Sequence, residues 1–268
     1  MLTAKRTTLA VLTAGCLLSG MANAAEAGKS ATVSTPEQEA HTDEIAKDYL
    51  PAHPAVLIEV SQRLQAQKQE KQQQAMMTAV IQNQAALLDD KGTPSYGPAS
   101  AEVAVVEFFD YQCIYCARLA PELEKEIKAN PGVRFVFKEF PVFGLHWPAS
   151  LSAAKTGLQV WQQKGADAYM KYHNAIYATG HNEGQLTDTD ISEAAKVVKF
   201  DAGKAGDVQG TLDGINMLAR QLNFSGTPAL VVLPSNGASP DNVTVIPGYL
   251  STEAIQMAIN KAADYSQK

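Results

Sequence analysis

The feature that most constrains this 268-residue chain is a pair of cysteines, Cys113 and Cys116, with two residues between them. The pair follows the apolar, β-prone run 103–109, which predicts a buried strand, and it opens the run 113–130, which predicts a helix. A cysteine at a helix start meets unpaired backbone N–H groups and the positive end of the helix dipole, so its thiol loses its proton readily. The sequence therefore predicts a nucleophilic Cys113 and a Cys116 that resolves the mixed disulfide.

Two other uses of a C-x-x-C pair fit the rest of the chain less well. A disulfide across two residues closes a tiny loop, so it removes little entropy from the unfolded state. A zinc site takes four ligands, typically a second C-x-x-C or a nearby histidine pair. The five histidines are scattered without ligand spacing; they are His41, His53, His146, His173 and His181. We therefore predict no metal site within one chain and no cofactor, whereas a copper ion shared by the thiolates of two chains stays open.

The first 24 residues have the pattern of a secretory signal peptide: two basic residues, an apolar run over 9–21 and the small-residue sequence ANA. We expect export to the periplasm and cleavage after Ala24. Cys16 offers an alternative, lipoprotein anchoring, which the continued apolar run and the later cleavage site disfavour. Removal of this segment changes the formal net charge from −6 to −8, and an acidic chain disfavours nucleic acid as a partner.

Residues 25–92 predict a helical segment and a linker that precede the main domain. A short helix is expected over 37–50, and the run 55–90 contains no Gly or Pro and is rich in helix formers. Apolar residues fall on one helical face near both ends of this run, whereas its middle, QAQKQEKQQQ, has no apolar stripe. We therefore expect self-association through residues 37–90 as a homodimer, with a trimer possible. A solvated spacer helix is the alternative.

Residues 93–268 predict one α/β domain. After the strand and helix around the cysteines, a second strand is expected over 133–140, then a helical block over about 149–222. Two strands and a closing helix follow, expected over 227–233, 243–246 and about 252–263.

At this point the chain resembles the thioredoxin superfamily, and within it the bacterial periplasmic DsbA-like thiol–disulfide oxidoreductases. The resemblance covers about 100–265. It rests on EFFDYQCIYC, on Pro121 in the following helix, on Thr227-Pro228 and on the inserted helical block. It implies a thioredoxin fold with an inserted helical subdomain. The N-terminal arm resembles subfamilies in which a helical extension builds a dimer or trimer, among them a homodimeric disulfide isomerase.

The resemblance also implies roles for single residues. Pro228 matches the cis-proline that faces the cysteine pair, and Thr227 would offer its backbone to a substrate strand. Glu107, six residues before Cys113, matches a buried acid that exchanges a proton with the resolving cysteine. Lys138 on the neighbouring strand is a candidate partner for that acid.

The residues between the cysteines, Ile114 and Tyr115, complete the predicted substrate-binding set. Tyr115 and Thr227 match features that occur among disulfide isomerases of the family, so we favour an isomerase or reductase. A DsbA-type dithiol oxidase is the alternative, and a copper-binding or chaperone-like oligomer is an alternative of another class. The expected partners are exported proteins with cysteines and a membrane redox protein of DsbD or DsbB type.

Overall fold

The computed structural model describes residues 35–266. The predicted signal peptide, the cleavage site after Ala24 and the lipidation alternative at Cys16 therefore lie outside the described residues. The chain divides into two compact units, Met1–Gln62 and Arg63–Lys268, and each is described by itself.

The first unit contributes helix α1, Pro36–Ala52, and the start of helix α2, Pro54–Gln82. Thr35 begins α1 with a capping box, because its hydroxyl accepts from the N–H of Gln38 and the Gln38 side chain accepts from the N–H of Thr35. No side chain of α1 is buried. The long α2 agrees with the predicted helix, since this run lacks helix breakers after its first residue.

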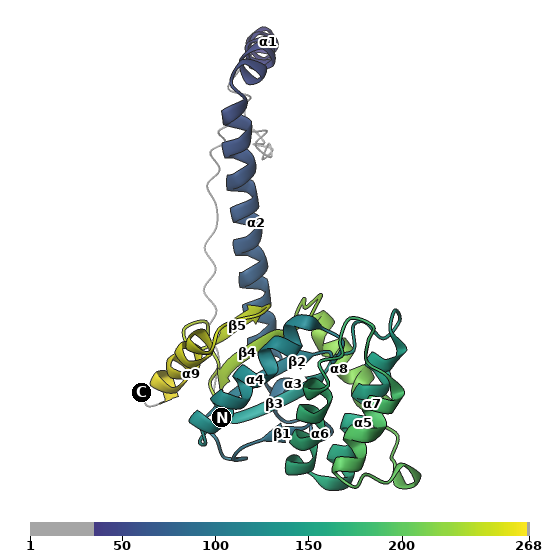
Figure 1. Ribbon diagram of the computed structural model, residues 1–268. Helices are drawn as coiled ribbons and strands as arrows, with labels where there is room; N and C mark the ends of the chain where they lie inside the picture. Colours follow the sequence, from purple (N-terminus) through teal and green to yellow (C-terminus); the bar gives the residue numbers. More distant parts are fainter. Residues whose placement is uncertain (1–34, 267–268) are drawn as a thin grey trace, which may run out of the picture. The chain divides into compact units, whose positions relative to one another are not determined.

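The second unit is built on a five-stranded sheet in the order β1-β3-β2-β4-β5 (Figure 1). The strands are β1 Ser95–Tyr96, β2 Val103–Phe109, β3 Arg134–Glu139, β4 Ala229–Pro234 and β5 Thr244–Pro247. Strands β2 and β3 pair in parallel, and the other neighbours are antiparallel. The parallel pair needs a crossover, which the helix that follows the cysteines provides.

Helices cover both faces of this sheet (Figure 1). The helices of this unit after α2 are α3 Gln84–Leu88, α4 Ile114–Ala129, α5 Pro148–Lys164, α6 Ala166–Ala178, α7 Asp188–Val197, α8 Gln209–Gln221 and α9 Thr252–Ser266, with a 3-10 turn at Ala202–Lys204. One core joins α4, α6 and α9 to a sheet face that includes Val105 and Phe109. The other core joins the end of α2, α3 and α8 to the opposite face. This confirms the predicted thioredoxin fold with an inserted helical subdomain.

Two local features differ from the predicted elements. The predicted single helix over 55–90 is interrupted at Asn83, whose side-chain amide donates to the carbonyl of Ala79 over 2.8 Å and competes with helical bonding. Strand β1, which pairs with β3 at the sheet edge, is not among the predicted strands. Its two residues are too few to give a strand pattern in the sequence.

Candidate active site

The two cysteines lie at the start of α4, where the predicted strand and helix meet. Cys113 is the N-terminal cap of α4, with extended backbone angles (φ −83°, ψ 118°), and Cys116 lies within the first turn. Both thiols are unbridged. Cys113 is 5% exposed and Cys116 is fully buried, so an incoming partner meets Cys113 first.

The two thiols have opposite proton affinities. The pKa of Cys113 is lowered to about 6, chiefly by the hydrogen bond from the Cys116 thiol, with help from backbone N–H groups of the first turn and against the effect of burial. The pKa of Cys116 is raised well above its usual value by burial, and the neighbouring Cys113 adds to the effect. At neutral pH the pair therefore holds one thiolate, on Cys113, and one proton, on Cys116.

Thr227 and Pro228 approach Cys113 from the start of β4. The Thr227-Pro228 peptide bond is cis. The Cys113 sulfur lies 3.2 Å from the carbonyl oxygen of Thr227, and when Cys113 is protonated its thiol donates a hydrogen bond to that oxygen. The hydroxyl oxygen of Thr227 is buried and has no hydrogen-bond partner among the described residues. The structure thus brings together the cysteine and the Thr-Pro pair, which lie 114 residues apart in sequence.

The two residues between the cysteines differ in exposure. Ile114 is half-buried, whereas Tyr115 is 52% exposed. The guanidinium of Arg118 lies 5.4 Å from the centre of the Tyr115 ring, a cation–π contact that orients the ring. A partner at Cys113 can therefore reach an aromatic surface on the same turn of the helix.

Glu107 lies on β2 and is 2% exposed, with its Oε2 unpaired among the described residues. Its pKa is raised to about 8, first by burial and then by the negative charge on Cys113. The negative charge of Glu107 in turn raises the pKa of the buried Cys116 thiol. Such a carboxyl can hold or release a proton near neutral pH, which is the property that proton transfer with Cys116 needs.

The predicted pairing of Lys138 with Glu107 is wrong. Because side chains alternate along a strand, Lys138 of β3 faces the opposite side of the sheet from Glu107. Its ammonium donates to the carbonyl of Ala86 and the hydroxyl of Thr93, both at 3.1 Å, and lies 3.5 Å from the Asp90 carboxylate. Lys138 therefore ties α3 and the following segment to the sheet.

A second buried acid, Glu139 at the end of β3, was not predicted. It is fully buried, and its Oε1 accepts hydrogen bonds from the hydroxyls of Tyr111 and Tyr169 at 3.1 and 3.0 Å. Burial raises the pKa of Glu139 well above its usual range, although these hydrogen bonds oppose the effect. His173 of α6 also lies among these rings, and burial lowers its pKa to about 4. This cluster can be identified only when it is known which face of α6 packs against β3, and the spacing of residues in the sequence does not show that.

Asp110 fixes the turn between β2 and the cysteines. Its carboxylate accepts from the N–H of Gln112 at 2.8 Å, the N–H of Phe143 at 2.9 Å and the hydroxyl of Ser150 at 2.7 Å. Its backbone carbonyl accepts from the N–H of Cys113. The active-site turn is therefore held to the loop after β3 and to α5.

The described residues contain no group of three or more His, Cys, Asp and Glu side chains that could hold a metal ion. In the same part of the chain, none of the helices has the length and apolar character needed to cross a membrane.

Two family models match the chain. The model described as Thioredoxin matches residues 89–242, and the model described as Copper resistance protein ScsC N-terminal domain matches residues 38–75. The first match covers more than half of the chain and includes both cysteines and Thr227-Pro228. The second covers most of α1 and much of α2.

Solved structures are similar to much of the chain. BcfH of Salmonella enterica Typhimurium is 43% identical, with 84% of this chain and 96% of that chain covered and a TM-score of 0.75. The catalytic domain of Proteus mirabilis ScsC is 27% identical, with 70% and 98% covered and a TM-score of 0.60.

Curated proteins match over different shares of their length. Disulfide bond formation protein D of Bacillus subtilis is 24% identical over 188 residues, which are 64% of this chain and 77% of that protein. Two Na(+)/H(+) antiporters of Salinispora species also match, but the chain spans only 23% and 21% of their lengths.

Proposed function

The chain belongs to the thioredoxin family, as a DsbA-like member with an N-terminal extension, and on this premise we propose that it exchanges thiols and disulfides in exported proteins in the periplasm. The observation that carries the proposal is the Cys113 thiol at the start of α4, 3.2 Å from the Thr227 carbonyl and hydrogen-bonded to Cys116. A low-pKa thiolate beside a protonated partner thiol suits both attack on a disulfide and its later release.

The steps follow from the positions of the two thiols. The Cys113 thiolate attacks one sulfur of a client disulfide, a new sulfur–sulfur bond forms, and the other client sulfur leaves as a thiolate that takes a proton. In the mixed disulfide Cys113 carries no charge, which removes one of the two causes that raise the pKa of Glu107, so the carboxylate of Glu107 can accept the proton of Cys116. Cys116 then attacks the mixed disulfide, which frees the client cysteine and leaves Cys113 bonded to Cys116. In isomerisation a different cysteine of the client instead attacks the client sulfur of the mixed disulfide as a thiolate, so a new client disulfide forms and Cys113 leaves as a thiolate.

We favour isomerase or reductase activity over dithiol oxidation. Tyr115 between the cysteines and Thr227 before the proline match the pattern that occurs among isomerases of the family. An isomerase must stay reduced, so a membrane redox partner of DsbD type is expected. A DsbA-type oxidase would instead be reoxidised by a partner of DsbB type.

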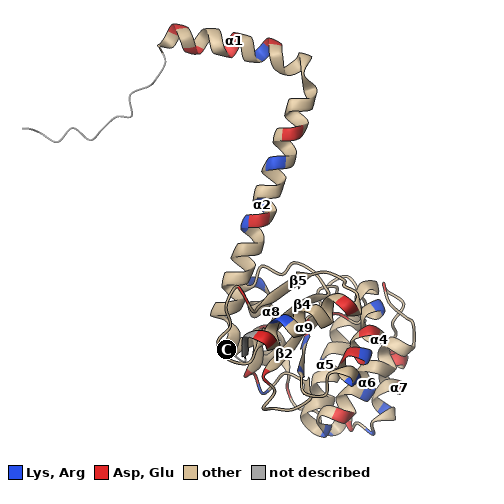
Figure 2. Ribbon diagram, turned by 90° about the vertical axis from the view of Figure 1, so that its left-hand side faces the viewer, with Lys and Arg blue, Asp and Glu red and all other residues tan. Residues whose placement is uncertain are grey.

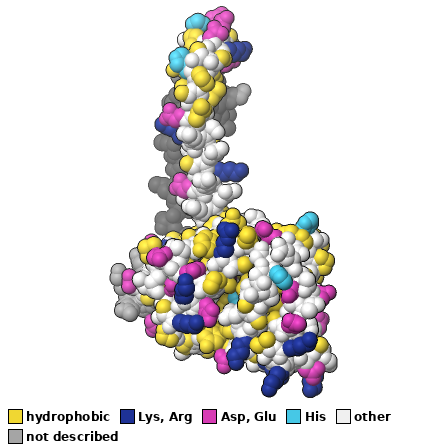
Figure 3. Space-filling view, in the orientation of Figure 1, with side chains coloured by type: hydrophobic (Ala, Val, Ile, Leu, Met, Phe, Trp, Pro, Cys, Tyr) yellow, Lys and Arg dark blue, Asp and Glu magenta, His cyan; other side chains and the backbone are white. Residues whose placement is uncertain are grey.

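We also propose that residues 37–90 join copies of the chain into a dimer or trimer, and that residues 93–268 form the catalytic domain. Apolar side chains at the start of α2 are exposed, and Figure 3 shows hydrophobic atoms on the surface of the N-terminal arm. Leu57, Ile58 and Val60 are 50%, 59% and 47% exposed. Helices with such unburied stripes gain stability when they pair.

Measuring the equilibrium of the Cys113–Cys116 disulfide with glutathione, together with the assembly mass and the reactivation of scrambled ribonuclease, tests this proposal. An oligomer that reactivates the scrambled enzyme supports the isomerase. A strongly oxidising monomer without reactivation would make it a DsbA-type oxidase. A double variant with both cysteines changed to Ser that still prevents client aggregation would favour a chaperone, and copper bound in proportion to the oligomer would favour the copper alternative.

A further inference from the structure

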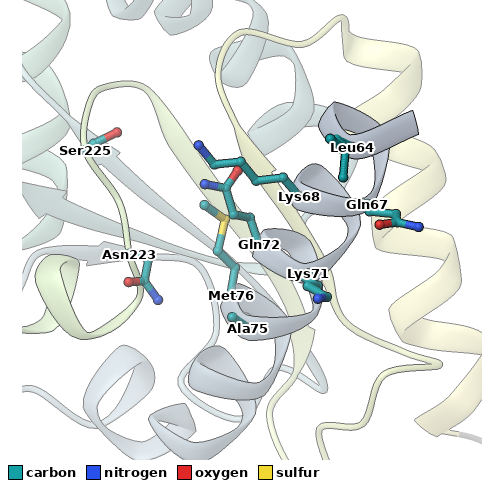
Figure 4. A pocket seen from close by; sticks show the side chains of 9 residues that line it. All are labelled: Leu64, Gln67, Lys68, Lys71, Gln72, Ala75, Met76, Asn223 and Ser225. Carbon is teal, nitrogen blue, oxygen red and sulfur yellow. The ribbon is translucent and has the colours of Figure 1, made fainter. Parts of the chain in front are cut away.

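A groove of about 670 Å³ lies between α2 and the segment that leads into Thr227 (Figure 4). One wall is the part of α2 between Leu64 and Met76, and the other holds Asn223 and Ser225. Ser225 precedes Thr227 by two residues, so the groove begins within about 7 Å of Thr227 along an extended chain. A polypeptide bound at Cys113 and Thr227 could therefore continue into the groove.

The side chains in the groove combine the apolar groups of Leu64, Ala75 and Met76 with polar and basic groups. Figure 4 shows Lys68, Gln72 and Met76 projecting from α2 toward the wall with Asn223 and Ser225. Lys71 lies one turn from Lys68 and also lines the groove. None of the described residues that line it is acidic. Methionine and long, amphipathic side chains suit surfaces that accept varied partners.

The basic character of this groove contrasts with the chain as a whole, whose formal net charge is −6. Figure 2 shows side chains of both charges along α2. The charged side chains that line this groove are Lys68 and Lys71, and both are basic. A second copy of the chain fits the groove less well, because six of the nine residues that line it carry polar or charged side chains. The more apolar stripe of α2, around Leu57, Ile58 and Val60, lies outside it.

We propose that this groove binds the segment of a client polypeptide that flanks the cysteine under attack, and that it favours segments rich in Asp and Glu. This inference rests on the proposed function, since the client must first engage Cys113. The lysines would attract the acidic segment, the amides would donate hydrogen bonds to it, and Met76 and Leu64 would contact its aliphatic parts. The N-terminal extension would then contribute to client choice as well as to assembly.

The test uses the reduced full chain and a set of short peptides, each with one cysteine held as a disulfide to a chromophoric thiol. A run of Glu is placed on one flank of the cysteine or on the other, and matched peptides carry Lys instead. Release of the chromophore reports the rate of attack by Cys113. We expect the Glu run to speed the reaction about tenfold over the Lys run on one flank only, because the groove lies on one side of Thr227.

The variant Lys68→Gln with Lys71→Gln should abolish that flank-specific preference while keeping the rate with uncharged peptides. A matched control is Lys125→Gln with Lys128→Gln, which removes two exposed lysines at the same spacing from α4 and should keep the preference. Equal effects on both flanks, or a preference that survives in the Lys68 and Lys71 variant, would overturn the proposal.

Two further outcomes would each overturn a different proposal. If no peptide reacts with Cys113, the proposed function fails, and the groove proposal with it. If the Lys68 and Lys71 variant changes the mass of the assembly, the groove is an interface between copies and the client proposal is wrong.

Discussion

The hydroxyl of Tyr111 donates a 3.1 Å hydrogen bond to the carboxyl of Glu139, and so ties the loop before Cys113 to the end of β3. The same carboxyl oxygen accepts from Tyr169 of α6. The two phenols make equivalent bonds, but only Tyr111 adjoins the active-site turn. This difference allows the positioning effect of the buried acid to be separated from its effect on stability.

Tyr111→Phe should raise the pKa of Cys113, because a looser turn presents the N–H groups of α4 less well to the thiolate. Tyr169→Phe is the matched control, since it also removes one buried hydrogen bond, at a cost of about 1 kcal/mol in the free energy of unfolding. Urea unfolding and the pH dependence of Cys113 alkylation measure the two effects. Equal changes in the pKa of Cys113 in both variants would contradict a specific role for Tyr111.

Glu107→Gln should stabilise the reduced protein and slow its exchange. The pKa of Glu107 in the folded state is about 8, above the value near 4.5 expected when unfolded, so folding favours the protonated form. Stability from this group is complete below about pH 4.5 and is lost as the pH rises toward 8. The Gln variant should therefore gain on the order of a few kcal/mol over the wild type at pH 8 and nothing at pH 4.

Denaturant unfolding across this pH range measures the gain in stability of Glu107→Gln, and the rate of the resolving step measures how much its exchange is slowed. We expect that step to slow on the order of a hundredfold at neutral pH, because Cys116 loses its proton acceptor. An unchanged resolving rate would remove Glu107 from the proposed proton transfer and leave it as a buried acid that only costs stability.

Cys113→Ser should abolish exchange, whereas Cys116→Ser should accumulate mixed disulfides with clients. The reason is that Cys113 holds the thiolate and the more accessible sulfur, while Cys116 is needed only for release. Non-reducing gels of each variant with a reporter client distinguish the two. Equal partial losses in both variants would contradict the assigned roles.

Much of the fold could be predicted from the sequence because its signals are local. The strand over 103–109 has the predicted bounds, since its apolar run has clear ends. The family resemblance predicted that Thr227 and Pro228 lie beside Cys113, and in the structure the Cys113 sulfur contacts the Thr227 carbonyl. The residue roles stay predictions.

Other parts depend on how distant elements meet. The predicted Lys138–Glu107 pair is wrong because the adjacency of two strands does not determine on which face of the sheet each side chain lies. Glu139 had no signal in the sequence because its partner Tyr169 comes from α6. His173 of α6 had none because the rings of Phe109 and Phe137 beside it come from β2 and β3. Strand β1 was missed because two residues at a sheet edge take their conformation from pairing with β3.

Titration of the ultraviolet thiolate absorbance of the reduced protein measures whether Cys113 is a thiolate at neutral pH. We expect a midpoint near pH 6 that is absent in Cys113→Ser, with Cys116 titrating only far above the usual range. Because folding lowers this pKa from about 9, the reduced protein should also lose stability as the pH falls toward 6. A midpoint near pH 9 that Cys113→Ser removes would contradict the account.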